Sequence, residues 1–434
     1  MDLSINRDNK VFQDVKQRRN DVAIPTKFFI GIIVSCYFFP FEFTFLPSGL
    51  NTKIMLALFG VLLLGIRSIK EKSITLDKEL MPAILLAALF SIIGFISVDI
   101  NYSSDYSYAN YWISFSTWLL GAYTTCEIIR YFYGYTSFKL LFDYLIAVCV
   151  VQCFLALIID NVEPFKIFID TYISQSTVAE VEFLNRVERL YGIGAAVDVA
   201  GTRFSIVLLA LSAILVGSSR NRTNTFYYWS AFVIITIIGN MMSRTTIIGT
   251  SLGILYIVLN STSLMKSLSL DRLKMWRTIF VVTFIIVAIA VFFYQTNEII
   301  REQIRFGFEG FFNWIEIGTL TTESTERLNS VMWIWPDSND YKTWIIGKAT
   351  FSDWHAVGTD IGYCRFVFYS GLLGLITFSL FFVCNAFICA SKFQSYKVFF
   401  FFLLALTFII WLKVATDLFI IYALFYCLEP KEVS

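Results

Sequence analysis

Apolar runs long enough to cross a lipid bilayer recur along almost the whole chain. A hydrocarbon core of ~30 Å requires roughly 17–25 residues of helix, and backbone groups in lipid must be bonded within their own segment. Twelve such segments lie at 28–46, 53–69, 80–98, 109–130, 139–159, 201–218, 226–242, 245–261, 278–295, 363–389, 397–412 and 414–428. The last two are also compatible with one broken helix. The sequence therefore predicts an all-α, polytopic membrane helical bundle of about 12 transmembrane helices, within a range of about 11–13.

Composition supports this class over a soluble one. Hydrophobic residues make up 57% of the 434 positions and charged residues 15%, whereas soluble domains have roughly 45–50% and 25%. The N-terminal 20 residues are polar and lack the apolar core of a cleaved signal peptide. We therefore expect the first apolar segment to direct insertion.

Basic residues are unevenly divided between alternate connections. The connections on the side of the two termini contain 21 of the 34 Lys and Arg residues, and the opposite connections contain 13. Short loops rich in Lys and Arg face the cytoplasm. We therefore expect cytoplasmic tails at 1–27 and 429–434, with a single transmembrane domain at 28–428. The outer basic residues concentrate in two long loops, about 160–200 and 296–362, which favours chemistry at the outer face.

The first long loop contains arginines and closely spaced glycines. These are Arg186, Arg189, Arg203, Gly192, Gly194 and Gly201. We expect Arg203 within the first turn of the next helix, at headgroup depth, where a guanidinium suits a phosphate or pyrophosphate group. The glycines would let a ligand approach the backbone. A flexible loop with an arginine that snorkels to lipid headgroups fits the same residues.

A short turn between two apolar segments contains Ser243 and Arg244. A charge this close to an apolar run is costly unless it is paired, and it commonly marks a site. Ser243 could cap the following helix, whose N-terminal end would then favour an anion beside Arg244. An interfacial anchor is the structural alternative.

The second long loop contains the only histidine of the chain, His355. A near-neutral pKa suits a base that takes a proton from a hydroxyl, although a lone loop histidine is more often incidental. Asp360 could act as the base, cap the next helix or pair with Arg365. Five of the ten tryptophans lie in the same loop, which fits stacking on sugar rings and fits equally well a helix on the membrane surface.

Three elements in this order resemble the bacterial O-antigen polymerase and ligase superfamily. They are the Arg-Gly segment RLYGIG, the SRT turn two helices later, and a last large outer loop that opens with TESTER and ends IIGKATFSDWH…GTDIGYCRFVFYSGLLG. The final stretch looks most like capsular and exopolysaccharide polymerases. The resemblance covers roughly residues 180–380, and the motifs are moderately specific only in combination.

The resemblance implies a metal-independent, membrane-embedded glycosyltransferase of the GT-C-like kind in the bacterial inner membrane. Its donor would be a growing glycan on undecaprenyl pyrophosphate, and its acceptor a sugar hydroxyl of the next lipid-linked repeat unit. The pyrophosphate would be held by Arg189, Arg203, Arg244 and Arg327, with Arg365 and Lys348 as further candidates. The family's histidine position is held here by Thr359 and Asp360, so His355 and Asp360 remain alternative bases.

No cofactor is implied, and no nucleic acid is expected as a partner. A chain-length regulator and a flippase for the lipid-linked oligosaccharide are the protein partners that the resemblance implies. A metal could also stabilise the leaving group, and Asp99 and Asp105 are possible ligands, but carboxylates in such a loop are usually solvated. The same residues also fit an O-antigen ligase that transfers glycan to lipid A core. From another class, a flippase or exporter would need charges at the membrane midplane, and Asp143 and Asp417 are the candidates.

Overall fold

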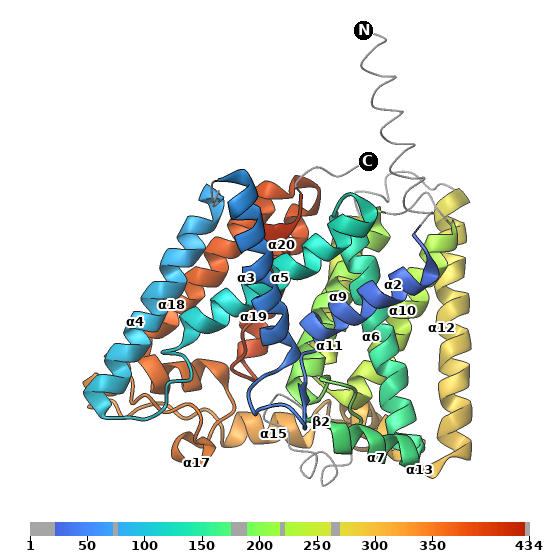
Figure 1. Ribbon diagram of the computed structural model, residues 1–434. Helices are drawn as coiled ribbons and strands as arrows, with labels where there is room; N and C mark the ends of the chain where they lie inside the picture. The colour runs from blue at the N-terminus through green and yellow to red at the C-terminus, as the bar shows by residue number, and fades with distance from the viewer. Residues whose placement is uncertain (1–21, 73–76, 175–188, 218–221, 262–269, 430–434) are drawn as a thin grey trace.

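The computed structural model describes residues 22–72, 77–174, 189–217, 222–261 and 270–429. The regular secondary structure of the described part is helical except for one small antiparallel sheet, in which β1 (Glu42–Phe43) pairs with β2 (Ile173–Ser174). The long helices run between the two ends of the molecule, and short helices gather at one end (Figure 1). The predicted all-α class is therefore confirmed.

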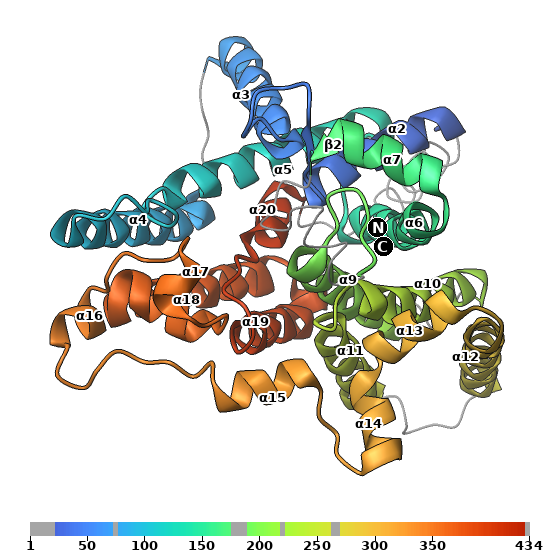
Figure 2. The same ribbon diagram turned by 90° about the horizontal axis from the view of Figure 1, so that it is seen from below.

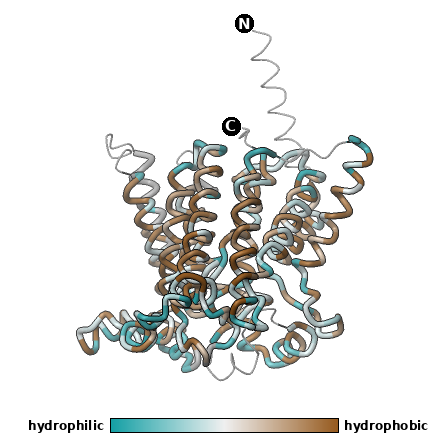
Figure 3. Tube along the Cα trace, turned by 90° about the vertical axis from the view of Figure 1, so that its left-hand side faces the viewer, coloured by the Kyte–Doolittle hydropathy of each residue, from teal (hydrophilic) through white to brown (hydrophobic). Residues whose placement is uncertain are grey.

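Seven described helices are long and apolar enough to cross a membrane. They correspond to α3 (Thr52–Glu71), α4 (Met81–Asn101), α6 (Phe138–Asn161), α9 (Val197–Gly217), α10 (Arg222–Met242), α18 (Gly362–Lys392) and α19 (Lys397–Trp411). The protein is therefore a multi-pass membrane protein. Figure 3 shows hydrophobic residues along the long helices and hydrophilic ones gathered towards the ends.

Five further helices overlap the remaining predicted segments. They are α2 (Ile24–Phe38), α5 (Tyr111–Tyr133), α11 (Thr246–Ser261), α12 (Leu270–Thr296) and α20 (Phe419–Cys427). Each of the twelve predicted apolar segments thus overlaps one helix. That all twelve cross the bilayer remains a prediction.

The short helices belong to the two long loops. They are α7 (Glu163–Tyr172), α13 (Glu298–Gly307), α14 (Glu309–Ile317), α15 (Glu323–Ser330), α16 (Tyr341–Ile345) and α17 (Trp354–Val357). Figure 1 places them together at its lower end, which we call the loop end. At the opposite end lie two 3₁₀ turns, η1 (Lys78–Leu80) and η2 (Gln394–Tyr396). Residues 1–21, 175–188 and 430–434, Arg186 among them, lie outside the described residues.

Helix α9 is the central helix of one half of the bundle (Figure 2). All its residues from Ala200 to Leu215 are buried. Glycines allow α11 to pack closely on it: a Cβ added to Gly249 would lie 2.2 Å from the Cα of Ser205. Small residues are a common way to bring membrane helices together.

Aromatic side chains fill the core of the other half. Phe378 of α18 stacks on Phe90 of α4, with ring centroids 4.4 Å apart, and on Trp411, 5.5 Å away. Offset and edge-to-face contacts of this kind add to the burial of apolar area. This core supports the loop-end segments that follow α4 and precede α18.

Two predicted helices are shorter than expected. The segment predicted at 28–46 ends its helix at Phe38, because Phe39 precedes Pro40 and leaves the helical region at φ −127°. The segment predicted at 414–428 becomes helical only at Phe419. There the carboxylate of Asp417 accepts a hydrogen bond from the Phe419 N–H at 2.8 Å, as expected of an Asp that ends a loop.

Helix α20 consequently has nine residues, about 14 Å of helix against a ~30 Å hydrocarbon core. The chain between α19 and α20 is non-helical from residue 412 to 418. Trp411 fixes it by donating from Nε1 to the Thr416 carbonyl at 2.9 Å. This segment, the α19–α20 connection, carries Lys413.

Candidate functional site

Arg189 and Arg244 lie over one aromatic ring at the loop end. Their guanidinium carbons are 5.1 Å and 4.0 Å from the ring centre of Phe306 in α13. The two carbons therefore lie within about 9 Å of each other, the sum of these distances, each of which is within cation–π range. The structure thus brings together two arginines that the sequence places 55 residues apart.

The Arg-Gly segment is held in place by helix α6. The buried amide of Gln152 donates to the Ile193 carbonyl at 2.9 Å and accepts from the Ile193 N–H at 3.0 Å. A Cβ on Gly192 would lie 2.4 Å from Gln152 Oε1, and one on Gly194 would lie 2.4 Å from the Phe39 carbonyl oxygen. The expectation that these glycines admit a ligand is therefore wrong here, since the protein's own groups occupy the space.

The SRT turn packs against the start of α9. A Cβ on Gly201 would lie 2.4 Å from Ser243 Oγ, so this glycine too makes room for the protein. Arg244 pairs with Glu309 of α14 at 2.6 Å, and the two side chains are 16% and 23% exposed. The pair orients Arg244 without enclosing it fully.

Lys413 joins these two arginines and was not singled out from the sequence. Its amine donates to Thr245 Oγ1 at 3.1 Å, and this hydroxyl lies 3.3 Å from the carboxylate of Asp198. The only sequence signal is a single lysine in a short outer turn, which by itself resembles an interfacial anchor. The structure shows instead that the α19–α20 connection directs it inwards.

The three cations Arg189, Arg244 and Lys413 lie close enough to act on one another electrostatically, and we call them the cation site. Burial lowers the pKa of Lys413; Asp198 and Asp360 oppose this, and Arg189 and Arg244 add to it. Burial also lowers the pKa of Arg244, opposed by Glu309 and reinforced by Arg189. Clustered, partly dehydrated cations are stabilised by an anion between them.

Several guanidinium nitrogens have no hydrogen-bond partner among the described residues. The buried Nε atoms of Arg189, Arg244 and Arg365 are of this kind, as is one terminal nitrogen of Arg203. A buried donor without a partner costs roughly 1–3 kcal/mol. Such donors at a positively charged site are suited to the oxygens of a phosphate-type ligand.

Arg203 lies deeper than predicted. Helix α9 begins at Val197, so Arg203 is in its second turn, and its side chain is buried over the rings of Phe38 and Phe39 at 6.0 and 5.4 Å. The prediction that Arg203 lies in the first turn is wrong, because the helix starts earlier than the apolar run. The interior position excludes lipid-facing snorkelling.

Arg327 is on the exposed helix α15. One turn earlier, Glu323 donates its backbone N–H to Glu309 at 2.8 Å and acts electrostatically on Arg244. Residues four apart share a helix face, so Arg327 lies on the same face of α15 as Glu323.

Asp360 lies close enough to Lys413 and Arg365 for its charge to raise the pKa of Lys413 and to act on Arg365. It does not cap α18: the N-cap position is Ile361, with no side-chain cap. Arg365 donates to the Phe351 carbonyl, with its guanidinium 4.0 Å from the Phe351 ring centre. His355 is in α17, and its side chain lies outside the described part of the chain.

Two other residues singled out from the sequence, Lys348 and Asp105, make their contacts away from the cation site. Lys348 is half exposed and pairs with Asp340 at 3.4 Å. Asp105 accepts backbone hydrogen bonds from Phe351 and Ser352, both at 2.6 Å. Burial raises the pKa of Asp105, but its hydrogen bonds outweigh this and leave the pKa below its ordinary value. Asp105 therefore holds two loop-end segments together.

The candidate charges for a transport path lie near helix ends. Asp143 is in the second turn of α6 and accepts a hydrogen bond from Tyr228 at 2.6 Å. Asp417 is in the α19–α20 connection, two residues before the start of α20. In the described residues, no group of three or more His, Cys, Asp or Glu side chains is arranged to hold a metal.

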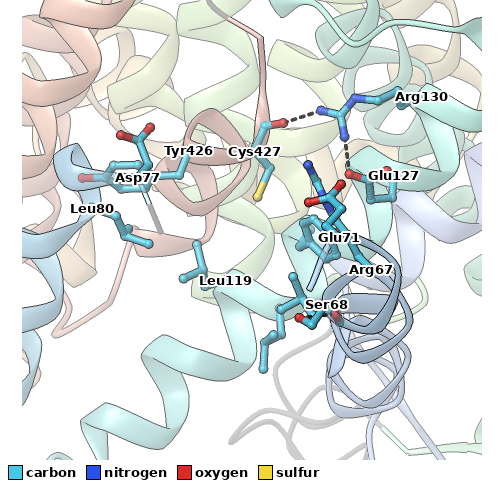
Figure 4. Close-up of a pocket in the computed structure, with 13 residues that line it drawn as sticks. Arg67, Ser68, Glu71, Asp77, Leu80, Leu119, Glu127, Arg130, Tyr426 and Cys427 are labelled. Atoms are coloured by element: carbon cyan, nitrogen blue, oxygen red, sulfur yellow. Dashed lines mark hydrogen bonds and ion pairs between the residues drawn. The ribbon is translucent and has the colours of Figure 1, made fainter. Parts of the chain in front are cut away.

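A cavity of about 280 Å³ lies at the opposite end of the bundle, between α3, α5 and α20 (Figure 4). Its charges are mutually paired: Arg67 with Glu71 at 2.9 Å, and Arg130 with Glu127. Paired charges leave little attraction for a further ion, so the loop end carries the stronger site.

Fold and site together define a multi-pass helical membrane protein with a cluster of cations at one end of its bundle. Comparison with protein-family models, curated proteins and solved structures finds no match.

Proposed function

We propose that the protein is a bacterial polysaccharide polymerase of the inner membrane. It transfers a growing glycan from undecaprenyl pyrophosphate to a sugar hydroxyl of the next lipid-linked repeat unit, at the outer face. The observation that carries this proposal is the convergence of Arg189, Arg244 and Lys413 at the loop end.

The chemistry requires a site for negative charge. The bond between the anomeric carbon and the pyrophosphate oxygen breaks, and a bond to the acceptor oxygen forms. The electron pair of the broken bond stays on the pyrophosphate, and the acceptor proton passes to a base. Preorganised cations stabilise such a leaving group, each by about 3 kcal/mol. Asp360, whose charge acts on Lys413, is the base that the geometry favours.

The proposed orientation places the loop end at the outer face of the inner membrane, with twelve spans and both termini in the cytoplasm. Labelling of single cysteines introduced at exposed positions in 296–362, with a reagent that does not cross the membrane, tests it. Labelling only after the membrane is broken would place the loop in the cytosol and overturn the proposal.

Purified protein incubated with undecaprenyl-pyrophosphate repeat units, extracted from cells that carry it, is expected to produce a ladder of longer glycans. A ligase or a flippase produces no ladder from this substrate alone. Arg189→Ala and Arg244→Ala are expected to abolish the ladder. Arg305→Ala is the matched control, because Arg305 is 43% exposed and pairs with Glu316 on the surface. A normal ladder from both site variants would contradict the proposal.

A further inference from the structure

The four tryptophans of the second long loop whose side chains the structure describes form two different groups. Trp333 contacts Trp335 at a tilt of 32° with ring centroids 6.0 Å apart, and Trp335 stacks on Trp344 with centroids 5.9 Å apart. We call these three the tryptophan ladder. Trp314 is separate, on α14.

The ladder presents open indole faces. The rings of Trp335 and Trp344 are inclined by only 14°, and parallel rings with centroids this far apart are offset, so each leaves part of a face uncovered. Trp333 and Trp335 are 44% and 40% exposed. Trp344 is fixed by a hydrogen bond from Nε1 to the Asp337 carbonyl at 3.1 Å.

A membrane anchor has a different appearance, which α14 illustrates. There Trp314 is accompanied by Phe311, Ile315 and Ile317, all more than half exposed, as on a helix that lies in the interface. The ladder instead lies largely in non-helical chain, where the exposed side chains of Tyr341 and Ile345 are accompanied by charged groups. Asp340 there pairs with Lys348 at 3.4 Å. Flat apolar faces beside charged hydrogen-bonding groups suit a sugar, whose C–H face stacks on indole and whose hydroxyls need polar partners.

The ladder begins beside the candidate base. Thr359, next to Asp360, donates a hydrogen bond from Oγ1 to the carbonyl of Met332 at 2.5 Å. A Cβ on Gly358 would lie 3.3 Å from the side chain of Ile334. Met332 and Ile334, the two neighbours of Trp333, therefore lie against residues 358–359, which precede Asp360. From there the ladder extends towards α16.

We propose that the tryptophan ladder is a glycan-binding site that stacks successive sugar rings next to the reacting hydroxyl. This inference rests on the proposed function, which supplies the glycan. The rings can belong to the incoming repeat unit or to the growing chain, since both meet at Asp360.

Binding is tested without catalysis. The probe is the lipid-free oligosaccharide that mild acid releases from the undecaprenyl-pyrophosphate pool of cells that carry the protein, and equilibrium dialysis against the purified full chain gives its affinity. We expect Trp335→Ala to weaken binding about tenfold, the upper range of one aromatic stacking contact. Trp335→Phe, which keeps an aromatic face, should retain much of the affinity and shows that loss in the alanine variant is not misfolding. Trp314→Ala is the matched control and should bind as the parent does.

The two sources of sugar are separated by kinetics. A raised KM for the oligosaccharide as a soluble acceptor in Trp335→Ala assigns the ladder to the incoming unit. Shorter products with an unchanged KM assign it to the growing chain. Equal affinity in the parent and Trp335→Ala, or an equal loss in Trp314→Ala, would overturn the inference.

Failure of this inference is distinguishable from failure of the proposed function. If the parent protein binds the oligosaccharide through Trp335 but forms no polymer, the glycan-binding site is supported and the polymerase function is contradicted. If polymer forms and Trp335→Ala has no effect, the polymerase function is supported and the glycan-binding site is contradicted. Quenching of the ladder's fluorescence by brominated lipids, taken as the difference between parent and Trp335→Phe, would make it a membrane contact and also overturn the inference.

Discussion

The amine of Lys413 lies 3.1 Å from the hydroxyl of Thr245, the residue that follows Arg244. This contact joins the α19–α20 connection to the turn between α10 and α11. It places a third positive charge beside two arginines that already share a ring. The cation site therefore depends on the last fifth of the chain as well as on the two long loops.

Replacement of Lys413 by methionine should lower the rate of glycan polymerisation about 100-fold, the usual cost of removing one preorganised group that stabilises charge in the transition state. Thermal unfolding should change little, because a buried amine is itself costly to desolvate. Lys166→Met, on α7 at the same end, is the control. An unchanged rate in Lys413→Met would exclude Lys413 from the site.

The polymerisation rate should fall at alkaline pH because Lys413 loses its proton. Its pKa lies below the ordinary value of 10.5, chiefly through burial. The required charge is therefore present below that lowered pKa and lost above it. Stability should change in the opposite sense, since the unfolded state binds more protons in this window and stability then rises with pH. Comparison of pH–rate profiles for the parent and Lys413→Arg provides the check: arginine should move the alkaline fall to higher pH.

Asp360→Asn should reduce the rate by two or more orders of magnitude, within the roughly 10²–10⁴-fold range of general base catalysis. His355→Gln should have a smaller effect, because Asp360 is the group that the structure places near Lys413 and Arg365. Rates from single-turnover transfer decide between them. The reverse order of effects would assign the base to His355.

Gly371→Ala should destabilise the protein by about 3 kcal/mol, because its backbone is in a region that only glycine adopts readily. Gly371 has φ +64° and ψ −169°, and an added Cβ would lie 2.2 Å from the carbonyl group of Ile345. Gly31→Ala is the matched control: nothing lies within 4 Å of its added Cβ, and alanine in a helix is favoured by about 1 kcal/mol. Thermal unfolding in detergent should separate the two variants clearly.

Hydropathy was sufficient to locate the helices, since every apolar segment overlaps one. It was less successful at the helix ends, because single residues and polar contacts determine where a helix starts and stops. Helix α2 ends before Pro40, earlier than predicted, and α20 starts later than predicted, after the carboxylate of Asp417. An apolar run alone does not contain such information, because apolar residues in a loop packed against protein look the same as those in a helix.

The candidate site was predicted in part. Arg189 and Arg244 could be proposed as partners because the family resemblance assigned both to the pyrophosphate, and the structure does bring them together. Lys413 was missed because its environment depends on a chain connection that is far away in sequence. The glycines of the Arg-Gly segment were misinterpreted: a small residue permits close approach, but the sequence does not say whether a ligand or Gln152 approaches.

The short length of α20 has a consequence for permeability. Its residues from Phe419 to Phe425 are all buried. The part of the bundle between the α19–α20 connection and the end opposite the loop end is therefore filled by tightly packed, mainly apolar side chains. Water that reaches Lys413 and Asp417 from the loop end therefore meets a dry barrier beyond them. The protein can keep charged groups below its surface and still leave the ion gradients across the membrane intact.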